Sequence, residues 1–299
     1  MRTSTALQVI AVSGGLVVAD IGVPVLFPAR AATGQQDAPA ALRKARAAVG
    51  NEATRIKSLI LEGTIMSGFN GVTAEPMTTA VALTIQVLTP SYYLNRQQGS
   101  SITYLRGFRR EVAFFESRRT GEKNKGTGRT SPSMGAGELA MFRRYVARLL
   151  LGMFVEATAV LPIAPTAPAS TLRVPVKGPD EFAAVVELDP TTNVPVRLRY
   201  QDTVDYPERA VTDADRKAGV VPPWKHEVTE VTVSFEDRRH VDGFLVPFTI
   251  RQTAAGRRFE EIRLSRVVVN PPLTPADFGA LPGNSPDLAT SINPKRVRW

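Results

Sequence analysis

Basic side chains are the most prominent candidates for chemistry in this 299-residue chain. Twelve of its 37 lysines and arginines lie between residues 96 and 148, where only four acidic residues stand, so this segment carries a net charge of +8. The whole chain carries +9, so the remainder is close to neutral. Such a segment fits three alternatives, which are a solvated face, a site for anionic lipid or glycan, and a site for nucleic acid.

Aromatic residues interleave with these arginines, namely Tyr104, Phe108, Phe114 and Phe115. Proteins that bind single-stranded nucleic acid use aromatic rings in this way, as stacking platforms for bases. A strand with one wet face also alternates apolar residues with arginine. Because the start of the chain predicts export, we expect a solvated face or anionic lipid rather than nucleic acid.

Other motifs give little support for catalysis. The segment Gly121–Gly128 resembles a phosphate loop, but no Lys-Ser/Thr pair follows Gly126, so we expect a flexible basic loop. His226 and His240 lack the spacing of a zinc motif and are expected at strand edges. No Gly-x-Ser-x-Gly motif supplies a nucleophile. The sequence therefore predicts no catalytic residue, no metal site and no cofactor.

Four aspartates also cluster, at Asp202, Asp205, Asp213 and Asp215. A calcium loop needs more oxygen ligands in closer order. We instead expect a short helix capped by Thr212, with acidic residues in its first turn.

Composition narrows the class of protein. The chain has no cysteine, which excludes a disulfide scaffold, thiolate catalysis and an acylated N-terminal cysteine. Hydrophobic residues make up 43% and charged residues 22%, as in ordinary globular proteins. The length suits one or two domains, and large β folds often use it for one.

Residues 1–31 read as a secretory signal peptide. Arg2 precedes the largely apolar run Ala6–Phe27, and Ala29–Ala31 offers a cleavage site. Asp20 and Pro24 interrupt the run, which argues against a stable transmembrane helix. The alternatives are an uncleaved anchor and a misassigned start. We expect a mature protein that is soluble and periplasmic.

Strand-like segments dominate the body of the chain. A helix is predicted over Ala38–Val49, with Gly50 at its C-terminal cap. Ten strands are predicted over Ser58–Met66, Thr79–Leu88, Tyr92–Arg96, Ser101–Leu105, Glu111–Phe115, Phe182–Leu188, Pro195–Tyr200, Glu227–Phe235, Val246–Gln252 and Phe259–Val269. Because no helices alternate with them, they indicate one antiparallel sheet that is strongly curved or closed.

One helix interrupts this pattern, at Glu138–Ala157. Its apolar residues recur every three or four positions, whereas Arg143, Arg144 and Arg148 fall towards the other side. The stripe must be buried, and the concave face of the sheet is its natural partner. The flanking segments 123–137 and 161–170 either let the helix move as a lid or act as inert spacers.

Three stretches carry a resemblance to a known family. They are Val186–Tyr200, Phe235–Gln252 and Glu260–Phe278, with a strand ending in Leu-Asp, an Asp-Gly turn followed by Val-Pro, and a strand ending in Val-Asn. Together they resemble the LolA/LolB-type periplasmic lipoprotein carriers and related lipoprotein-sorting proteins. The resemblance implies an open β half-barrel closed by helices. It covers residues 182–278 well and 56–115 loosely, and residues 202–224 look inserted.

We therefore expect a mainly β (α+β) protein, in which a curved antiparallel half-barrel has one amphipathic helix on its concave face and a further N-terminal helix. The predicted layout is a signal peptide at 1–31, a leader and helix at 32–55, the half-barrel at 56–280 with its helix at 138–157, and a basic tail at 281–299.

The leading functional hypothesis is a non-enzymatic exported protein that binds a hydrophobic or anionic lipid, or the acyl chains of a lipoprotein, and that can touch a membrane surface. The residues expected at the ligand's apolar part are Phe142, Val146, Leu149, Met153 and Phe154, and those at its headgroup are Arg143, Arg144 and Arg148. The same apolar stripe is also typical of plain core. The alternative function is a periplasmic sensor or scaffold that binds a protein through sheet edges and the basic surface. The oligomeric state is not predicted.

Overall fold

The computed structural model describes residues 38–51, 56–67, 80–100, 102–119, 126–130, 136–161, 172–207, 214, 223–254 and 257–279. All of them belong to one compact unit, Gln36–Trp299. The predicted signal peptide and the predicted basic tail lie outside the described residues, as do Thr212, Asp213 and Asp215.

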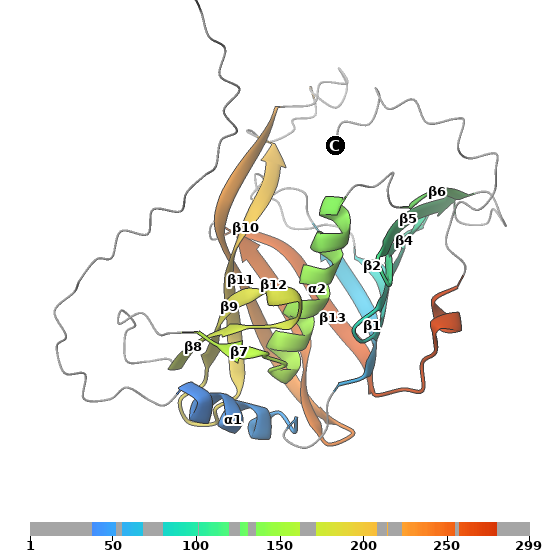
Figure 1. The fold of residues 1–299 in the computed structure, drawn as a ribbon. Helices are drawn as coiled ribbons and strands as arrows, with labels where there is room; N and C mark the ends of the chain where they lie inside the picture. The colour runs from blue at the N-terminus through green and yellow to red at the C-terminus, as the bar shows by residue number, and fades with distance from the viewer. Residues whose placement is uncertain are drawn as a thin grey trace, which may run out of the picture. The chain divides into compact units, whose positions relative to one another are not determined.

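Thirteen strands form one antiparallel sheet (Figure 1). Their bounds are β1 Ser58–Ser67, β2 Val81–Leu88, β3 Tyr92–Gln98, β4 Ile102–Arg109, β5 Val112–Arg119, β6 Gly126–Thr130, β7 Ala159–Val160, β8 Leu172–Lys177, β9 Ala183–Leu188, β10 Pro195–Pro207, β11 Trp224–Val241, β12 Phe244–Ala254 and β13 Arg257–Val269. Their order across the sheet is β6-β5-β4-β3-β2-β1-β13-β12-β11-β10-β9-β8-β7. Within each half of the sheet, strands that follow one another in the sequence pair with each other. In addition, β1 pairs with β13 and so joins the half formed by β1 to β6 to the half formed by β7 to β13.

Two α-helices and two short 3-10 helices complete the described fold. They are α1 Ala38–Ala48, α2 Ala136–Phe154, η1 Pro179–Glu181 and η2 Pro275–Phe278. Helix α2 contacts β4 and β5 in one half of the sheet and β10, β11 and β12 in the other. The sheet therefore curves around α2, which lies in its hollow (Figure 1). Among the described residues, the outer strands β6 and β7 pair only with β5 and β8, so the sheet is open and the predicted half-barrel is confirmed.

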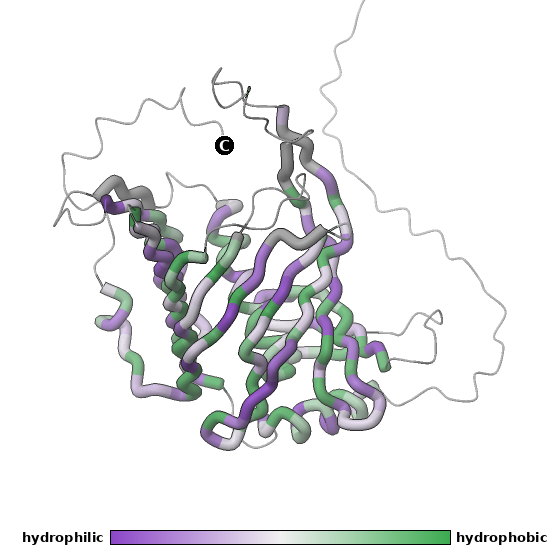
Figure 2. The backbone as a smooth tube through the Cα atoms, turned by 180° about the vertical axis from the view of Figure 1, so that it is seen from behind, coloured by the Kyte–Doolittle hydropathy of each residue, from purple (hydrophilic) through white to green (hydrophobic). Residues whose placement is uncertain are grey.

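Alternation along the strands explains why this sheet can hold a helix on one face. In β2 and in much of β12, every second residue is buried, and hydrophilic and hydrophobic residues follow one another along the strands in Figure 2. The buried rows join α2 in one core, which includes Ile85, Val233 and Ile250. Each such side chain contributes about 1.5–3 kcal/mol when it is fully removed from water.

Ion pairs account for much of the polar face in the second half of the sheet. Glu187 on β9 lies 3.0 Å from Arg173 and 2.8 Å from Arg199, on the two neighbouring strands. Glu261 on β13 lies 3.0 Å from Arg251 and 2.6 Å from Arg263. These four arginines, which lie outside the basic segment, are thus balanced locally.

Helix α1 ends at Ala48, one residue before the predicted Val49, and Gly50 takes the predicted position just after it. Gly50 follows the helix with a positive φ of 78°, and its amide donates to the Ala47 carbonyl at 3.0 Å. A Cβ at this position would lie 2.2 Å from the carbonyl oxygen of Gly243, in the turn between β11 and β12. Glycine is therefore required here both by conformation and by space.

The structure corrects the predicted strand count. Three strands are additional, and β6 begins inside the segment that was expected to be a loop. Strand β8 carries Pro175, and an internal proline argues against a strand because it lacks an N–H. Its carbonyl nevertheless accepts a hydrogen bond from Leu161 at 2.8 Å. Part of the segment predicted as inserted lengthens β10 and β11, which pair as far as Pro207 and Trp224.

Candidate functional site

Helix α2 places the five apolar residues that the sequence assigns to a ligand along the concave face. Each is at most 7% exposed, and all belong to the main core. The ring of Phe142 lies 6.1 Å from that of Tyr93 on β3, and the ring of Phe154 lies 5.8 Å from that of Phe244 on β12. The sheet's own side chains thus cover the stripe, and contact with a ligand stays a prediction that requires α2 to move.

The C-terminal end of α2 is held by groups from the N-terminal helix region. Arg46 on α1 donates to the carbonyls of Val155 at 3.1 Å and Ala157 at 2.6 Å. Asn51 donates to the carbonyl of Phe154 at 2.6 Å. Val155 has a φ of 59°, which ends the helix at Phe154 and not at the predicted Ala157.

Two arginines in the N-terminal half of α2 reach opposite halves of the sheet. Arg143 lies 2.6 Å from Glu111, in the turn between β4 and β5. Arg144 pairs with Asp202 on β10. Exposed ion pairs of this kind contribute about 0.2–1 kcal/mol each. They connect the helix weakly to both halves of the sheet, in contrast to the hydrogen bonds that the Arg46 and Asn51 side chains donate to backbone carbonyls at its other end.

The third arginine, Arg148, is enclosed. Its guanidinium donates to the hydroxyl of Tyr200 at 3.2 Å, pairs with Glu260 at 3.0 Å and donates to Gln252. The ring of Tyr145 lies 4.3 Å below it. Burial lowers the pKa of Arg148, but Tyr200 and Glu260 raise it by more, so the group stays charged. A headgroup at Arg148 remains a prediction, because the described structure gives this side chain three partners already.

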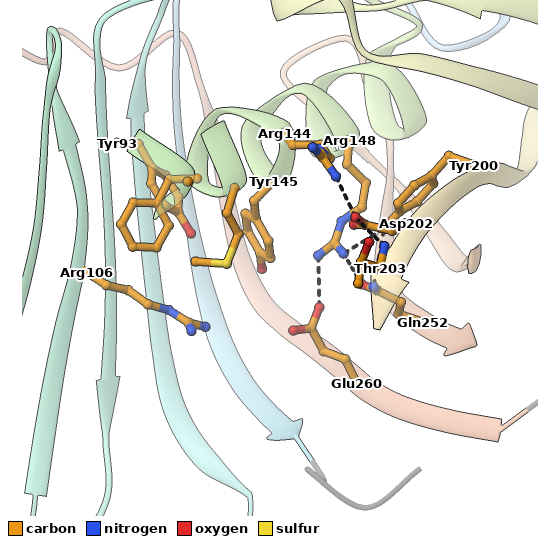
Figure 3. Close-up of a pocket in the computed structure, with 13 residues that line it drawn as sticks. Tyr93, Arg106, Arg144, Tyr145, Arg148, Tyr200, Asp202, Thr203, Gln252 and Glu260 are labelled. Carbon is orange, nitrogen blue, oxygen red and sulfur yellow. Dashed lines mark hydrogen bonds and ion pairs between the residues drawn. The ribbon is translucent and has the colours of Figure 1, made fainter. Parts of the chain in front are cut away.

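A cavity of about 460 Å³ lies beside the N-terminal half of α2 (Figure 3). Its walls come from α2, from β3 and β4 on one side, and from β10, β12 and β13 on the other. The lining residues are Tyr93, Arg106, Gly137, Met141, Phe142, Arg144, Tyr145, Arg148, Tyr200, Asp202, Thr203, Gln252 and Glu260. The volume falls within the usual range of small-molecule sites. Unlike the stripe below it, this cavity is rich in charges and hydroxyl groups.

Burial keeps the phenols of the cavity protonated. It raises the pKa of Tyr93 to about 12 and that of Tyr145 well above its usual value. Burial also raises the pKa of Tyr200, while Arg148 opposes it. At neutral pH the three hydroxyl groups are therefore available as hydrogen-bond donors.

Of the predicted site residues, the structure brings Phe142, Arg144 and Arg148 to this cavity. Val146, Leu149, Met153 and Phe154 lie in the core, and Arg143 pairs with Glu111. Sequence reasoning missed Tyr93, Arg106, Tyr145, Tyr200, Gln252 and Glu260 as site residues. Arg106 did lie in the basic segment, but nothing local separates it from the other basic residues there.

Comparison with known proteins bears on the fold. No protein-family model and no curated protein matches the chain. A LolA superfamily protein from Nitrosomonas europaea aligns with a TM-score of 0.45 and 9% identity, over 81% of this chain and 97% of that one. An outer membrane lipoprotein-sorting protein domain from Vibrio parahaemolyticus aligns with a TM-score of 0.39 and 13% identity, over 81% and 97%. A DUF1329 family protein from Desulfovibrio piger aligns with a TM-score of 0.37 and 10% identity, over 81% and 96%.

At these TM-scores and identities the three alignments carry no argument about the family of this chain or about its ligand.

The half-barrel thus combines two surfaces of different chemistry. Along the middle and C-terminal part of α2 the surface is apolar and closed, and beside its N-terminal half it is polar and hollow. Among the residues that the structure describes, no helix has the length and hydropathy to cross a membrane.

Proposed function

We propose that this protein is exported to the periplasm and binds a hydrophobic ligand or a lipid acyl chain beneath α2, without catalysing a reaction. One observation carries the proposal: in the part of the chain that the structure describes, one helix fills the hollow of an open, curved sheet and buries Phe142, Val146, Leu149, Met153 and Phe154 there. Displacing that helix would uncover a continuous apolar groove without breaking any strand pairing. Apolar area removed from water then supplies the binding free energy.

The two ends of α2 differ in how they are held, which suggests how the groove opens. Arg46 and Asn51 bind the carbonyls at the C-terminal end, whereas exposed ion pairs hold the N-terminal half. The cavity also lies at the N-terminal half. We therefore expect this half to swing outwards about a pivot near Phe154 to admit the ligand and then to close over it, so that α2 acts as a lid.

An entering acyl chain would first replace Phe142 against Tyr93. Val146 and Leu149 would follow as the lid rises, and Met153 and Phe154 would remain near the pivot. Arg143 and Arg144 would exchange Glu111 and Asp202 for the anionic surroundings of a lipid. These exchanges replace one weak ion pair by another and therefore cost little free energy.

Uptake of a fluorescent fatty-acid probe tests the groove. Phe142→Asp and Leu149→Asp should abolish uptake, because each places a charge in the apolar path. Ala140→Asp is the matched control, since Ala140 is exposed on the same helix. If the two core variants remain folded by circular dichroism and bind the probe like the wild type, the groove is not the site.

Three further measurements keep the test decisive if those variants unfold. Native mass spectrometry of protein purified from the cell envelope should show a co-purifying lipid, and cell fractionation should recover the protein from the periplasm. Because the chain lacks cysteine, Met141→Cys can also be labelled at one site beside the cavity. Its fluorescence should change when the probe binds to the unmutated groove, and an unchanged signal with an empty mass spectrum would contradict the proposal.

A further inference from the structure

We propose that the cavity beside α2 is an anion site that takes the carboxylate or phosphate group of the ligand, with Arg106 as its cation and the Tyr145 hydroxyl as a hydrogen-bond donor. The assignment rests on the proposed function in one respect, because it names the headgroup of the bound amphiphile. It uses residues different from those that the helix pattern indicated.

The cavity is lined by one more arginine than carboxylates. Three arginines and two carboxylates line it, and the pairs Arg144–Asp202 and Arg148–Glu260 account for four of these groups. The guanidinium of Arg106 makes no hydrogen bond or ion pair with the described residues, although the residue is half-buried on β4. An oxyanion in the cavity would supply the missing counter-charge, and guanidinium groups bind carboxylate and phosphate in a two-pronged geometry.

An unsatisfied hydroxyl lies in the same cavity. The Tyr145 oxygen is buried and has no hydrogen-bond partner in the described part of the chain. Buried polar groups are nearly always hydrogen-bonded, and an unmet one costs about 1–3 kcal/mol. Figure 3 shows the hydroxyl of Tyr145 and the guanidinium of Arg106 directed to the same side of α2. The phenol is protonated at neutral pH, so it can donate to an oxyanion and cannot itself neutralise Arg106.

The two carboxylates do not oppose this assignment. Asp202 and Glu260 are already bound to Arg144 and Arg148, which cancel their charge locally. Gly137, in the first turn of α2, also lines the cavity, so the positive end of the helix dipole adds to the field. Phe142 and Met141 form the apolar part of the wall, where the first carbons of a chain would lie.

Matched 12-carbon probes separate the headgroup from the chain. Isothermal titration calorimetry of dodecanoate, dodecyl phosphate and dodecanol should show that both anions bind at least about tenfold more tightly than the alcohol, as expected for charge-assisted hydrogen bonds. Arg106→Gln should remove most of this preference, and Tyr145→Phe should reduce it several-fold. Arg96→Gln is the control, because it removes the same charge from an exposed position on β3 and should leave the preference intact.

The unmutated protein gives a second readout that does not depend on how the variants fold. Inorganic phosphate should weaken binding of dodecanoate and leave that of dodecanol unchanged, because it competes only for the anion site. If inorganic phosphate binds as tightly as dodecyl phosphate, the site takes a free anion and not the headgroup of a lipid.

Failure of this assignment differs from failure of the proposed function. If all three probes bind with equal affinity in the wild type and in Arg106→Gln, the headgroup assignment is overturned and the acyl groove stands. If no 12-carbon probe binds but phosphate does so through Arg106, the anion site is supported and the acyl groove is overturned. If nothing binds, both proposals are wrong.

Discussion

The ring of Phe235 on β11 lies directly against the backbone of Gly152 on α2. A Cβ at residue 152 would stand 2.0 Å from Cζ of that ring and less than 3 Å from both Cε atoms. The helix and the sheet therefore touch at a point where one partner has no side chain. This contact sets how deeply α2 can sit in the half-barrel.

Gly152→Ala should accordingly weaken the packing of α2 against the sheet. Although alanine favours a helix by about 1 kcal/mol over glycine, the clash with Phe235 is expected to cost about 1–3 kcal/mol or more, so the free energy of unfolding should fall. Gly137→Ala is the control, because nothing lies within 4 Å of a Cβ there and the substitution should be neutral or stabilising. Urea unfolding of both variants measures the difference. Equal stability of the two would show that Phe235 moves aside without cost.

Much of the fold could be predicted from local patterns, and the sheet shows why. Alternation in Val81–Leu88 and Phe244–Ala254 reflects one buried and one wet face, and this information is contained in each segment. The helix pattern of α2 is equally local. The position where α2 ends is not set by local sequence alone. Arg46 and Asn51, more than 100 positions away, donate hydrogen bonds to the carbonyls of Val155 and Phe154 at this end.

The cavity could not be predicted, for a related physical reason. Tyr93, Arg106, Tyr145, Tyr200 and Glu260 come from five different elements. No spacing rule joins them, because curvature of the sheet alone brings its two halves together at α2. The sequence does show that basic residues are concentrated between residues 96 and 148, but it does not show that the Arg106 side chain has no ion-pair partner among the residues that the structure describes.

The pivot of the proposed lid can be weakened selectively. Asn51→Ala removes a buried donor to the Phe154 carbonyl, and the unmet carbonyl should cost about 1–3 kcal/mol. Hydrogen exchange should then accelerate at the C-terminal turn of α2 more than at its middle. Uniform acceleration along the whole helix would contradict a pivot at this end.

The Arg148–Glu260 pair should behave as a buried unit. With side chains only 8% and 13% exposed, removing either charge leaves the other unpaired, so Arg148→Met and Glu260→Gln should each cost about 3–5 kcal/mol. The double variant should cost less than their sum, and a double-mutant cycle from urea unfolding measures this coupling. Arg143→Gln, from the pair with Glu111 whose side chains are 28% and 76% exposed, should cost less than about 1 kcal/mol. Strict additivity at Arg148 and Glu260 would show that they do not act together.

Alkaline pH should destabilise the protein through its buried phenols. Burial raises the pKa of Tyr93 from 10 to about 12, so the folded state holds this proton more tightly than the unfolded state does. The stabilisation is complete below pH 10 and is lost as the pH rises towards 12, a change of about 2–3 kcal/mol for Tyr93 alone.

Guanidinium unfolding at pH 9, 10, 11 and 12 should follow this decline, while absorbance at about 295 nm reports phenolate formation. Tyr93→Phe should flatten the decline. A wild-type stability that stays constant from pH 10 to 12 would mean that these phenols ionise as freely in the folded chain as in the unfolded one.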